Sequence, residues 1–155
     1  MKVSIRHREG KCFEASTAKS SFLINSEEIS PIEYFAVGML SCSGVDIVTM
    51  STKQGFSLEN FSMDCEIERN GDYPQKFNSA HLIYCFDTNA PDEIAQRWVM
   101  ASIETYCSTI NTIRNCVEMR YSVVANGTMI IDHKTILKTN QPIEAMGDLG
   151  GCCTA

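Results

Sequence analysis

Two cysteines lie in segments whose hydrophobic pattern is typical of buried helices. Cys42 falls within the apolar run Tyr34–Met50, and Cys107 falls within Ile103–Asn115. A thiol in such a position commonly packs as a small, unreactive hydrophobic group. Two thiols in the two most strongly patterned helices also allow a nucleophile and a resolving partner that join as a disulfide. The residues by themselves leave both interpretations open.

The composition narrows the class of protein. The chain has 155 residues, which is enough for one domain with a real core. Its net charge of −6 and the lack of a basic cluster argue against a nucleic-acid partner. The N-terminal segment lacks the apolar core that a signal peptide has, and no stretch reaches the roughly 18 apolar residues that a membrane span needs. We therefore expect a cytoplasmic protein with neither a nucleic-acid nor a membrane partner.

The chain contains eight cysteines and no C-x-x-C pair. In the cytoplasm thiols stay mostly reduced, so a disulfide framework is not expected, and the spacing supports no zinc ribbon. The four cysteines outside the two helices and the tail are expected to be packing residues or to be uninformative: Cys12, Cys65, Cys85 and Cys116. Cys152 and Cys153, near the C-terminus, can bind metal, carry a modification or do neither.

A strong helix start is encoded by Ser30-Pro31-Ile32-Glu33. Serine caps a helix, proline suits the first helical position, and a glutamate three residues after the cap completes a capping box. Between Tyr34 and Met50 the only charged residue is Asp46, so this helix is expected to be enclosed on nearly every side, which indicates a dimer. Asp46 is expected to pair with a basic residue across that dimer or to be solvated or capped.

The remaining pattern predicts an α+β fold with an antiparallel sheet. A second helical segment begins near Asn89–Glu93, breaks near Ser102 and continues with Cys107 on its buried stripe. The segment Thr128–Ala155 is interpreted as an edge strand or a tail, so we expect a domain over residues 1–127 and an extension over 128–155. Strands are expected at Lys2–Arg8, Cys12–Ser16, Ser21–Ile24, Leu58–Arg69, Phe77–Phe86 and Met119–Val124.

Both cysteine segments resemble motifs of one family. Ser30-Pro31-Ile32-Glu33 followed by Ser41-Cys42-Ser43-Gly44-Val45-Asp46-Ile47-Val48 resembles the first cysteine helix of the OsmC/Ohr family. Glu104-Thr105-Tyr106-Cys107-Ser108 is similar to the second cysteine motif of that family. The similarity runs over roughly Val3–Val124 and includes the pair of strands between the motifs.

The resemblance implies a two-layer fold in which an antiparallel sheet packs on a long central helix, within an intertwined homodimer. Members with peroxidase activity reduce organic hydroperoxides without a cofactor and are reset by an external dithiol. By position, Cys42 corresponds to the peroxidatic cysteine, Cys107 to the resolving cysteine, and Glu33 to a glutamate near the reactive thiol. Glu33 can serve this role, the capping box, or both.

The chain also departs from the family pattern. Peroxidase members hold the thiolate with an arginine, commonly from a glycine-rich N-terminal loop, and no Gly-Gly-Arg occurs here; Arg6, Arg8 and Arg69 are the candidates. An apolar helix raises the pKa of a thiol, so the mechanism needs a nearby cation. From the resemblance, the expected function is a thiol peroxidase that acts on organic hydroperoxides. The alternative is a non-catalytic dimer that binds a small apolar ligand or acts as a thiol redox sensor.

Overall fold

A computed structural model describes residues 1–138, and the C-terminal extension with Cys152 and Cys153 lies largely outside the described residues. The chain divides into two compact units, Met1–Gly38 and Met39–Ala155. The helix α1 (Pro31–Gln54) begins in the first unit and ends in the second. Each unit is considered in turn.

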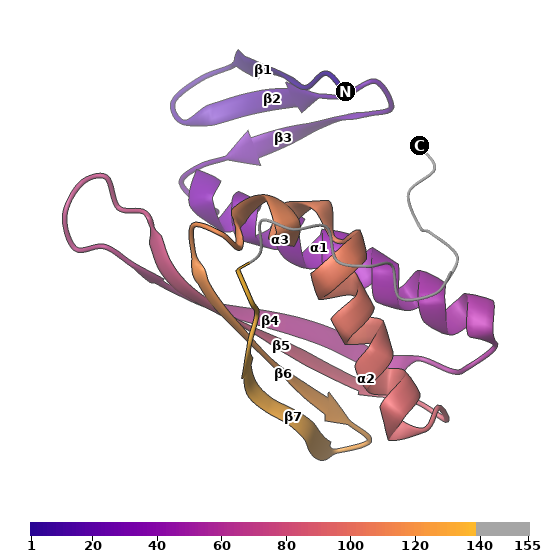
Figure 1. Ribbon diagram of the computed structural model, residues 1–155. Helices are drawn as coiled ribbons and strands as arrows, with labels where there is room; N and C mark the ends of the chain where they lie inside the picture. Colours follow the sequence, from indigo (N-terminus) through magenta and orange to yellow (C-terminus); the bar gives the residue numbers. More distant parts are fainter. Residues whose placement is uncertain (139–155) are drawn as a thin grey trace. The chain divides into compact units, whose positions relative to one another are not determined.

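The first unit contains a three-stranded antiparallel sheet in the order β1-β2-β3 (Figure 1). Its strands are β1 (Ser4–His7), β2 (Cys12–Ser16) and β3 (Ser21–Asn25). Gly10 turns the chain between β1 and β2 with a φ of +53°, a left-handed conformation that favours glycine. The three short strands predicted near the N-terminus are thus confirmed.

The predicted capping box at the start of α1 is present. The Ser30 main-chain N–H donates to the Glu33 carboxylate at 2.7 Å, and the Glu33 N–H donates to the Ser30 hydroxyl at 3.4 Å. At the other end, Gly55 adopts a φ of +76° and stops the helix. Local chemistry therefore determines both ends of the helix that carries Cys42.

A single chain covers only one side of α1, and the expected enclosure of the helix within a dimer stays a prediction. Val45 and Val48 are 59% and 46% exposed. Because of its apolar composition, α1 also passes a length-and-hydropathy test for a membrane span, although no such stretch was expected. A core helix passes the same test, and α1 packs on the second sheet through one buried face: Met39, Ser43, Asp46, Ile47, Met50 and Ser51.

The second unit contains a four-stranded sheet in the order β4-β5-β6-β7. The strands are β4 (Glu59–Arg69), β5 (Phe77–Asp87), β6 (Glu118–Ala125) and β7 (Thr128–Thr135). The strand β5 is central, with β4 on one side and β6 on the other. The β5–β6 pair is parallel, because the chain crosses over through helices between them, whereas the other two pairs are antiparallel. The sheet is therefore mixed rather than wholly antiparallel.

A tight hairpin adds β7 at the edge of the sheet. Asn126 and Gly127 have φ values of 52° and 73°, the left-handed pair that a two-residue hairpin turn requires. Of the two alternatives for the start of the C-terminal extension, the edge strand is the one observed. Asn126 also accepts a hydrogen bond from the Thr88 N–H at 2.9 Å, which ties this turn to the end of β5.

The crossover between β5 and β6 consists of α2 (Asp92–Ala101), a short π-helix η1 (Ser102–Tyr106) and α3 (Ser108–Ile113). The break predicted at Ser102 is confirmed. Cys107 was expected within a helix, but the structure places it outside one. It lies between η1 and α3 with an extended backbone, φ −69° and ψ 100°.

The N-terminus of α2 has no side-chain cap. Pro91 occupies the capping position there. The Asn89 side chain accepts a hydrogen bond from the Ser57 N–H at 2.8 Å. This contact joins the loop before β4 to the loop before α2, so the asparagine organises two connections instead of starting a helix.

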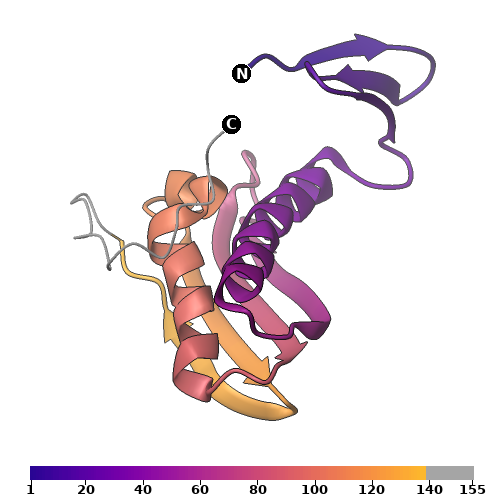
Figure 2. The same ribbon diagram turned by 90° about the vertical axis from the view of Figure 1, so that its right-hand side faces the viewer.

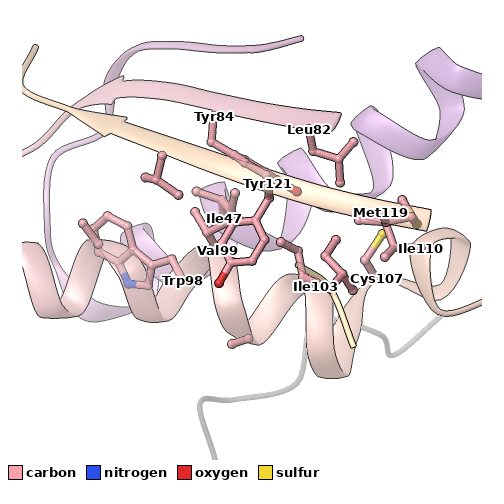
Figure 3. Close-up of a cluster of buried hydrophobic side chains, with 14 of the residues drawn as sticks. Ile47, Leu82, Tyr84, Trp98, Val99, Ile103, Cys107, Ile110, Met119 and Tyr121 are labelled. Carbon is pink, nitrogen blue, oxygen red and sulfur yellow. The ribbon is translucent and has the colours of Figure 1, made fainter. Parts of the chain in front are cut away.

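The core of the second unit lies between the sheet and the helices. Figure 2 shows α1 and α2 beside each other on the same face of the sheet. The indole of Trp98 donates to the Gln54 side chain at 2.9 Å and so links α2 to α1. In Figure 3, Trp98 lies at one end of the cluster and Cys107 at the other. The largest buried members are Trp98, Tyr84, Met39, Ile47, Met50, Leu82, Ile103, Ile110 and Met119.

Candidate functional site

The Cys42 thiol lies on the part of α1 that faces α3, and it is half-buried. Its sulfur accepts hydrogen bonds from the Thr109 main-chain N–H, the Thr109 hydroxyl and the Cys107 thiol. Cys42 and Cys107 are both free thiols. The fold thus brings together the two cysteines that the sequence singled out, although they are far apart in the chain.

The Cys107 thiol is fully buried and is presented by an irregular backbone. Because η1 has π geometry and α3 starts afresh, the chain changes direction at Cys107. The Asn111 side-chain amide holds this junction by donating to the carbonyls of Ile103 at 3.0 Å and Cys107 at 2.9 Å. These two bonds fix the position from which the Cys107 sulfur meets Cys42.

The two thiols differ in acidity. Burial raises the pKa of Cys42, but the hydrogen bonds from Thr109 and Cys107 outweigh it, so the pKa lies below its ordinary value. Burial also raises the pKa of Cys107, and the neighbouring Cys42 raises it further. Cys42 is therefore the thiol that ionises first, and Cys107 is the protonated donor beside it.

Thr109 is the residue of the site that the sequence did not reveal. Its hydroxyl oxygen lies 3.2 Å from the Cys107 sulfur, and its N–H and hydroxyl both donate to Cys42. Nothing in the spacing of Thr109 distinguishes it from other threonines in helical segments. Only its position two residues after Cys107 could have indicated a role, because the first N–H groups of a new helix are free to donate there.

A buried polar chain lies beside the cysteines. The Tyr84 hydroxyl and the Ser43 hydroxyl are 2.9 Å apart, and Ser43 and Ser102 are 2.8 Å apart. Ser102 donates to the Asp46 carboxylate at 2.9 Å. Asp46 is only 3% exposed, and its burial raises its pKa, against a smaller lowering by Ser102. The aspartate is therefore buried and hydrogen-bonded to a serine, not solvated as one alternative held.

Comparison with known proteins identifies the family. The family model of the OsmC-like protein matches residues 24–122, a range that contains both cysteines. The chain is a member of the OsmC-like family. No curated protein gives a significant match. The resemblance noted in the sequence is thereby confirmed for the family.

Solved structures support the fold of this OsmC-like chain. An OsmC-like protein from Mycoplasma pneumoniae is 10% identical with a TM-score of 0.69, over 80% of this chain and 95% of the other. A hypothetical protein from Aquifex aeolicus is 18% identical with a TM-score of 0.71, over 81% and 96%. An organic hydroperoxide resistance protein from Legionella pneumophila is 20% identical with a TM-score of 0.55, over 79% and 96%. At these identities the likeness establishes the fold alone.

The sequence predicts an arginine beside the Cys42 thiol. Among residues 39–138, the groups that shift the pKa of Cys42 include no guanidinium. Of the three candidates, Arg8 forms an ion pair with Glu14, and Arg69 donates to the Gln75 carbonyl at 3.0 Å. Arg6 lies on the exposed strand β1. In that part of the chain, the hydrogen bonds that lower the pKa of Cys42 come from Thr109 and Cys107.

Glu33 lies in the first turn of α1, within the unit Met1–Gly38. Hydrogen bonds from the Ser30 side chain and main chain lower the pKa of its carboxyl. The capping role is therefore confirmed, while a role beside the reactive thiol stays a prediction.

The other cysteines have separate surroundings. Cys65 faces the core from β4, and burial raises the pKa of its thiol to about 11. Cys116 is exposed just after α3, which differs from the structural role expected for it. Within the described residues no group of three or more histidine, cysteine or acidic side chains is arranged to hold a metal ion. The chemistry of the described site thus centres on Cys42 and Cys107.

Proposed function

We propose that this OsmC-like protein is a cytoplasmic, thiol-dependent peroxidase that reduces organic hydroperoxides. The observation that supports it is the contact between two free thiols of opposite pKa shift, Cys42 lowered and Cys107 raised. A nucleophile must be a thiolate, whereas a resolving thiol must stay intact until the first step is over. Three structural relatives carry the name of an organic hydroperoxide resistance protein, one of them only provisionally.

The first step is attack of the Cys42 thiolate on the terminal oxygen of the peroxide. The sulfur–oxygen bond forms as the O–O bond breaks, and the leaving alkoxide takes a proton from water to become an alcohol. Cys42 is then a sulfenic acid. Two electrons have passed from sulfur to the peroxide, so no cofactor is required.

The second step is attack of the Cys107 sulfur on the Cys42 sulfenic acid. The sulfur–oxygen bond breaks, and the hydroxide leaves as water with the proton that Cys107 gives up. An external dithiol then reduces the Cys42–Cys107 disulfide and is itself oxidised to a disulfide. This step returns both thiols to the reduced state in which the structure describes them.

The test is a peroxide-consumption assay with cumene hydroperoxide and hydrogen peroxide, driven by dithiothreitol. Cys42→Ser is expected to abolish consumption. Cys107→Ser is expected to stop after about one equivalent of peroxide, because its sulfenic acid is not resolved. Cys116→Ser, which removes an exposed thiol, serves as the matched control. Unchanged turnover in Cys42→Ser would refute the proposal.

We also propose that the protein forms a homodimer through the exposed side of α1. Val45 and Val48 lie on that side, where apolar surface is available to a second copy. Val48→Asp is expected to shift sedimentation toward a monomer, whereas Ser62→Asp on β4 is expected to leave it unchanged. A Val48→Asp protein that sediments like the wild type would contradict this assignment.

The second candidate is a non-catalytic dimer that binds a small apolar ligand or senses oxidants through its thiols. It is favoured because, among residues 39–138, no guanidinium is one of the groups that shift the pKa of Cys42. In this case the wild type would consume no peroxide beyond its own thiols. The same assay therefore separates the two functions.

A further inference from the structure

The hydroxyl of Thr109 interacts with both sulfurs of the candidate site. Its oxygen is 3.2 Å from the Cys107 sulfur, and it also hydrogen-bonds to Cys42. Each sulfur has a further donor of its own from the main chain of α3. Cys42 accepts from the Thr109 N–H, and Cys107 accepts from the Ile110 N–H. One hydroxyl is therefore shared between two thiols that each already have a fixed donor.

A hydroxyl carries a single hydrogen, so Thr109 can donate to only one sulfur at a time. The hydrogen is free to rotate about the Cβ–Oγ1 bond and points toward the acceptor that attracts it more. A charged acceptor makes a stronger hydrogen bond than a neutral one. The hydroxyl therefore follows the negative charge when the charge moves from one sulfur to the other.

The proposed reaction moves the charge in this way. Cys42 is the thiolate before the peroxide reacts, and it becomes a neutral sulfenic acid afterwards. Negative charge then develops on Cys107 as that sulfur loses its proton to attack. The main-chain donors do not need to move during this exchange, because the Asn111 amide fixes the Cys107 carbonyl and the turn that follows it.

We propose that the Thr109 hydroxyl is a catalytic hydrogen-bond donor that stabilises the Cys42 thiolate first and the Cys107 thiolate second. The first half of the proposal, stabilisation of the Cys42 thiolate, concerns the reduced protein alone. The second half, stabilisation of the Cys107 thiolate, rests on the proposed peroxidase function. The residue thus links the two chemical steps through a rotation of one hydrogen.

The key variants are Thr109→Val, which keeps the branched shape without the hydroxyl, and Thr109→Ser, which restores the hydroxyl. Thr112→Val is the matched control, because Thr112 lies on the exposed side of α3 and its hydroxyl donates only within the helix, to the Ser108 carbonyl at 2.7 Å. Circular dichroism and thermal unfolding establish that each variant is folded before any rate is compared.

The first measurement is alkylation of Cys42 by iodoacetamide in a Cys107→Ser background, which needs no peroxidase activity. Thr109→Val is expected to slow alkylation near neutral pH by about tenfold, since it loses one hydrogen bond to a charged sulfur. Thr109→Ser and Thr112→Val are expected to react like their parent. Equal alkylation of Thr109→Val and the parent would overturn the first half of the proposal.

The second measurement is stopped-flow oxidation by cumene hydroperoxide, with quench and mass spectrometry to follow sulfenic acid and disulfide separately. Thr109→Val is expected to slow both the formation of the sulfenic acid and its conversion to the disulfide, and Thr109→Ser to restore both. If Thr109→Val slowed only the formation of the sulfenic acid, the proposed role of the hydroxyl at both sulfurs would be overturned. A wild type that forms no sulfenic acid would instead refute the proposed function, while the alkylation result would stand.

Discussion

The Ser102 hydroxyl lies 2.9 Å from the Asp46 carboxylate and joins the two segments that carry the reactive cysteines. Asp46 is on the same helix as Cys42, and Ser102 begins the π-helix that leads to Cys107. The Asp46 carboxylate, at 2.9 Å, is a nearer acceptor for the Ser102 hydroxyl than the Ser43 carbonyl at 3.4 Å. With the Ser102 hydrogen on Asp46, Ser43 donates to Ser102 and Tyr84 donates to Ser43. The chain of hydroxyls therefore runs in one direction and ends on a buried carboxylate.

Removal of the Ser102 hydroxyl is expected to destabilise the protein. Ser102→Ala leaves the buried Asp46 carboxylate without its donor, so the free energy of unfolding should fall by about 1–3 kcal/mol. Urea denaturation followed by circular dichroism measures the change. Ser108→Ala, on the exposed side of α3, is expected to change it by less than about 0.5 kcal/mol. Equal stabilities of the two variants would show that the Ser102–Asp46 contact contributes nothing.

Neutralisation of Asp46 is expected to make Cys42 more acidic. The Asp46 charge raises the pKa of Cys42, in opposition to the donors from α3. Asp46→Asn should therefore move the midpoint of the alkylation rate against pH to a lower pH. Asp64→Asn, on the exposed side of β4, should leave the midpoint where it is. A midpoint that rises in Asp46→Asn would contradict the predicted repulsion.

The stability of the protein is expected to depend on Asp46 in weakly acidic solution. Burial raises the pKa of this carboxyl in the folded state above its value in the unfolded chain. The folded state then binds the proton more tightly, so the contribution to stability is present below about pH 4 and is lost as the pH rises through the folded pKa. Asp46→Asn should lack this loss in urea titrations between about pH 4 and neutrality. Identical pH profiles for both proteins would refute the assignment.

The Asn111 side chain is expected to control how fast the disulfide forms. It holds the carbonyls on both sides of the junction that presents Cys107. Asn111→Ala should slow conversion of the sulfenic acid to the disulfide by about tenfold or more, because a small misplacement of a reacting group has a large kinetic cost. The formation of the sulfenic acid on Cys42 should change much less. Thr112→Ala is the control, and a matching rate in both variants would argue against a positioning role.

The sequence was sufficient for features determined by local chemistry. Ser30 and Glu33 form the capping box that their spacing predicts, and Gly55 ends the helix. The large apolar groups on both faces of Phe77–Phe86 predict a central strand, and β5 lies between β4 and β6. Asn126-Gly127 also held enough information to predict the last hairpin, since few other dipeptides adopt left-handed conformations at both positions. In each case the residues involved are neighbours in the chain.

Hydrophobic spacing predicted that Cys107 is buried, but not that it lies outside a helix. A stripe at i, i+3 and i+4 is compatible with a π turn followed by a new helix, because the buried face is retained across the junction. The pattern of α1 likewise predicted burial for Val45 and Val48, which a single chain leaves exposed. Hydrophobic periodicity predicts which residues are buried, but it does not predict which element or which chain buries them.

The sequence by itself determined the strands, the ends of the long helix and the two cysteines that belong to a family motif. Only the tertiary structure decided that Cys42 and Cys107 touch, that the Thr109 hydroxyl lies within hydrogen-bond reach of both sulfurs, and that Ser102 donates to the buried Asp46. The reason is physical. Capping and turn formation depend on bonds between chain neighbours, whereas the acidity of a thiol depends on donors and burial contributed by segments that only the folded chain brings together.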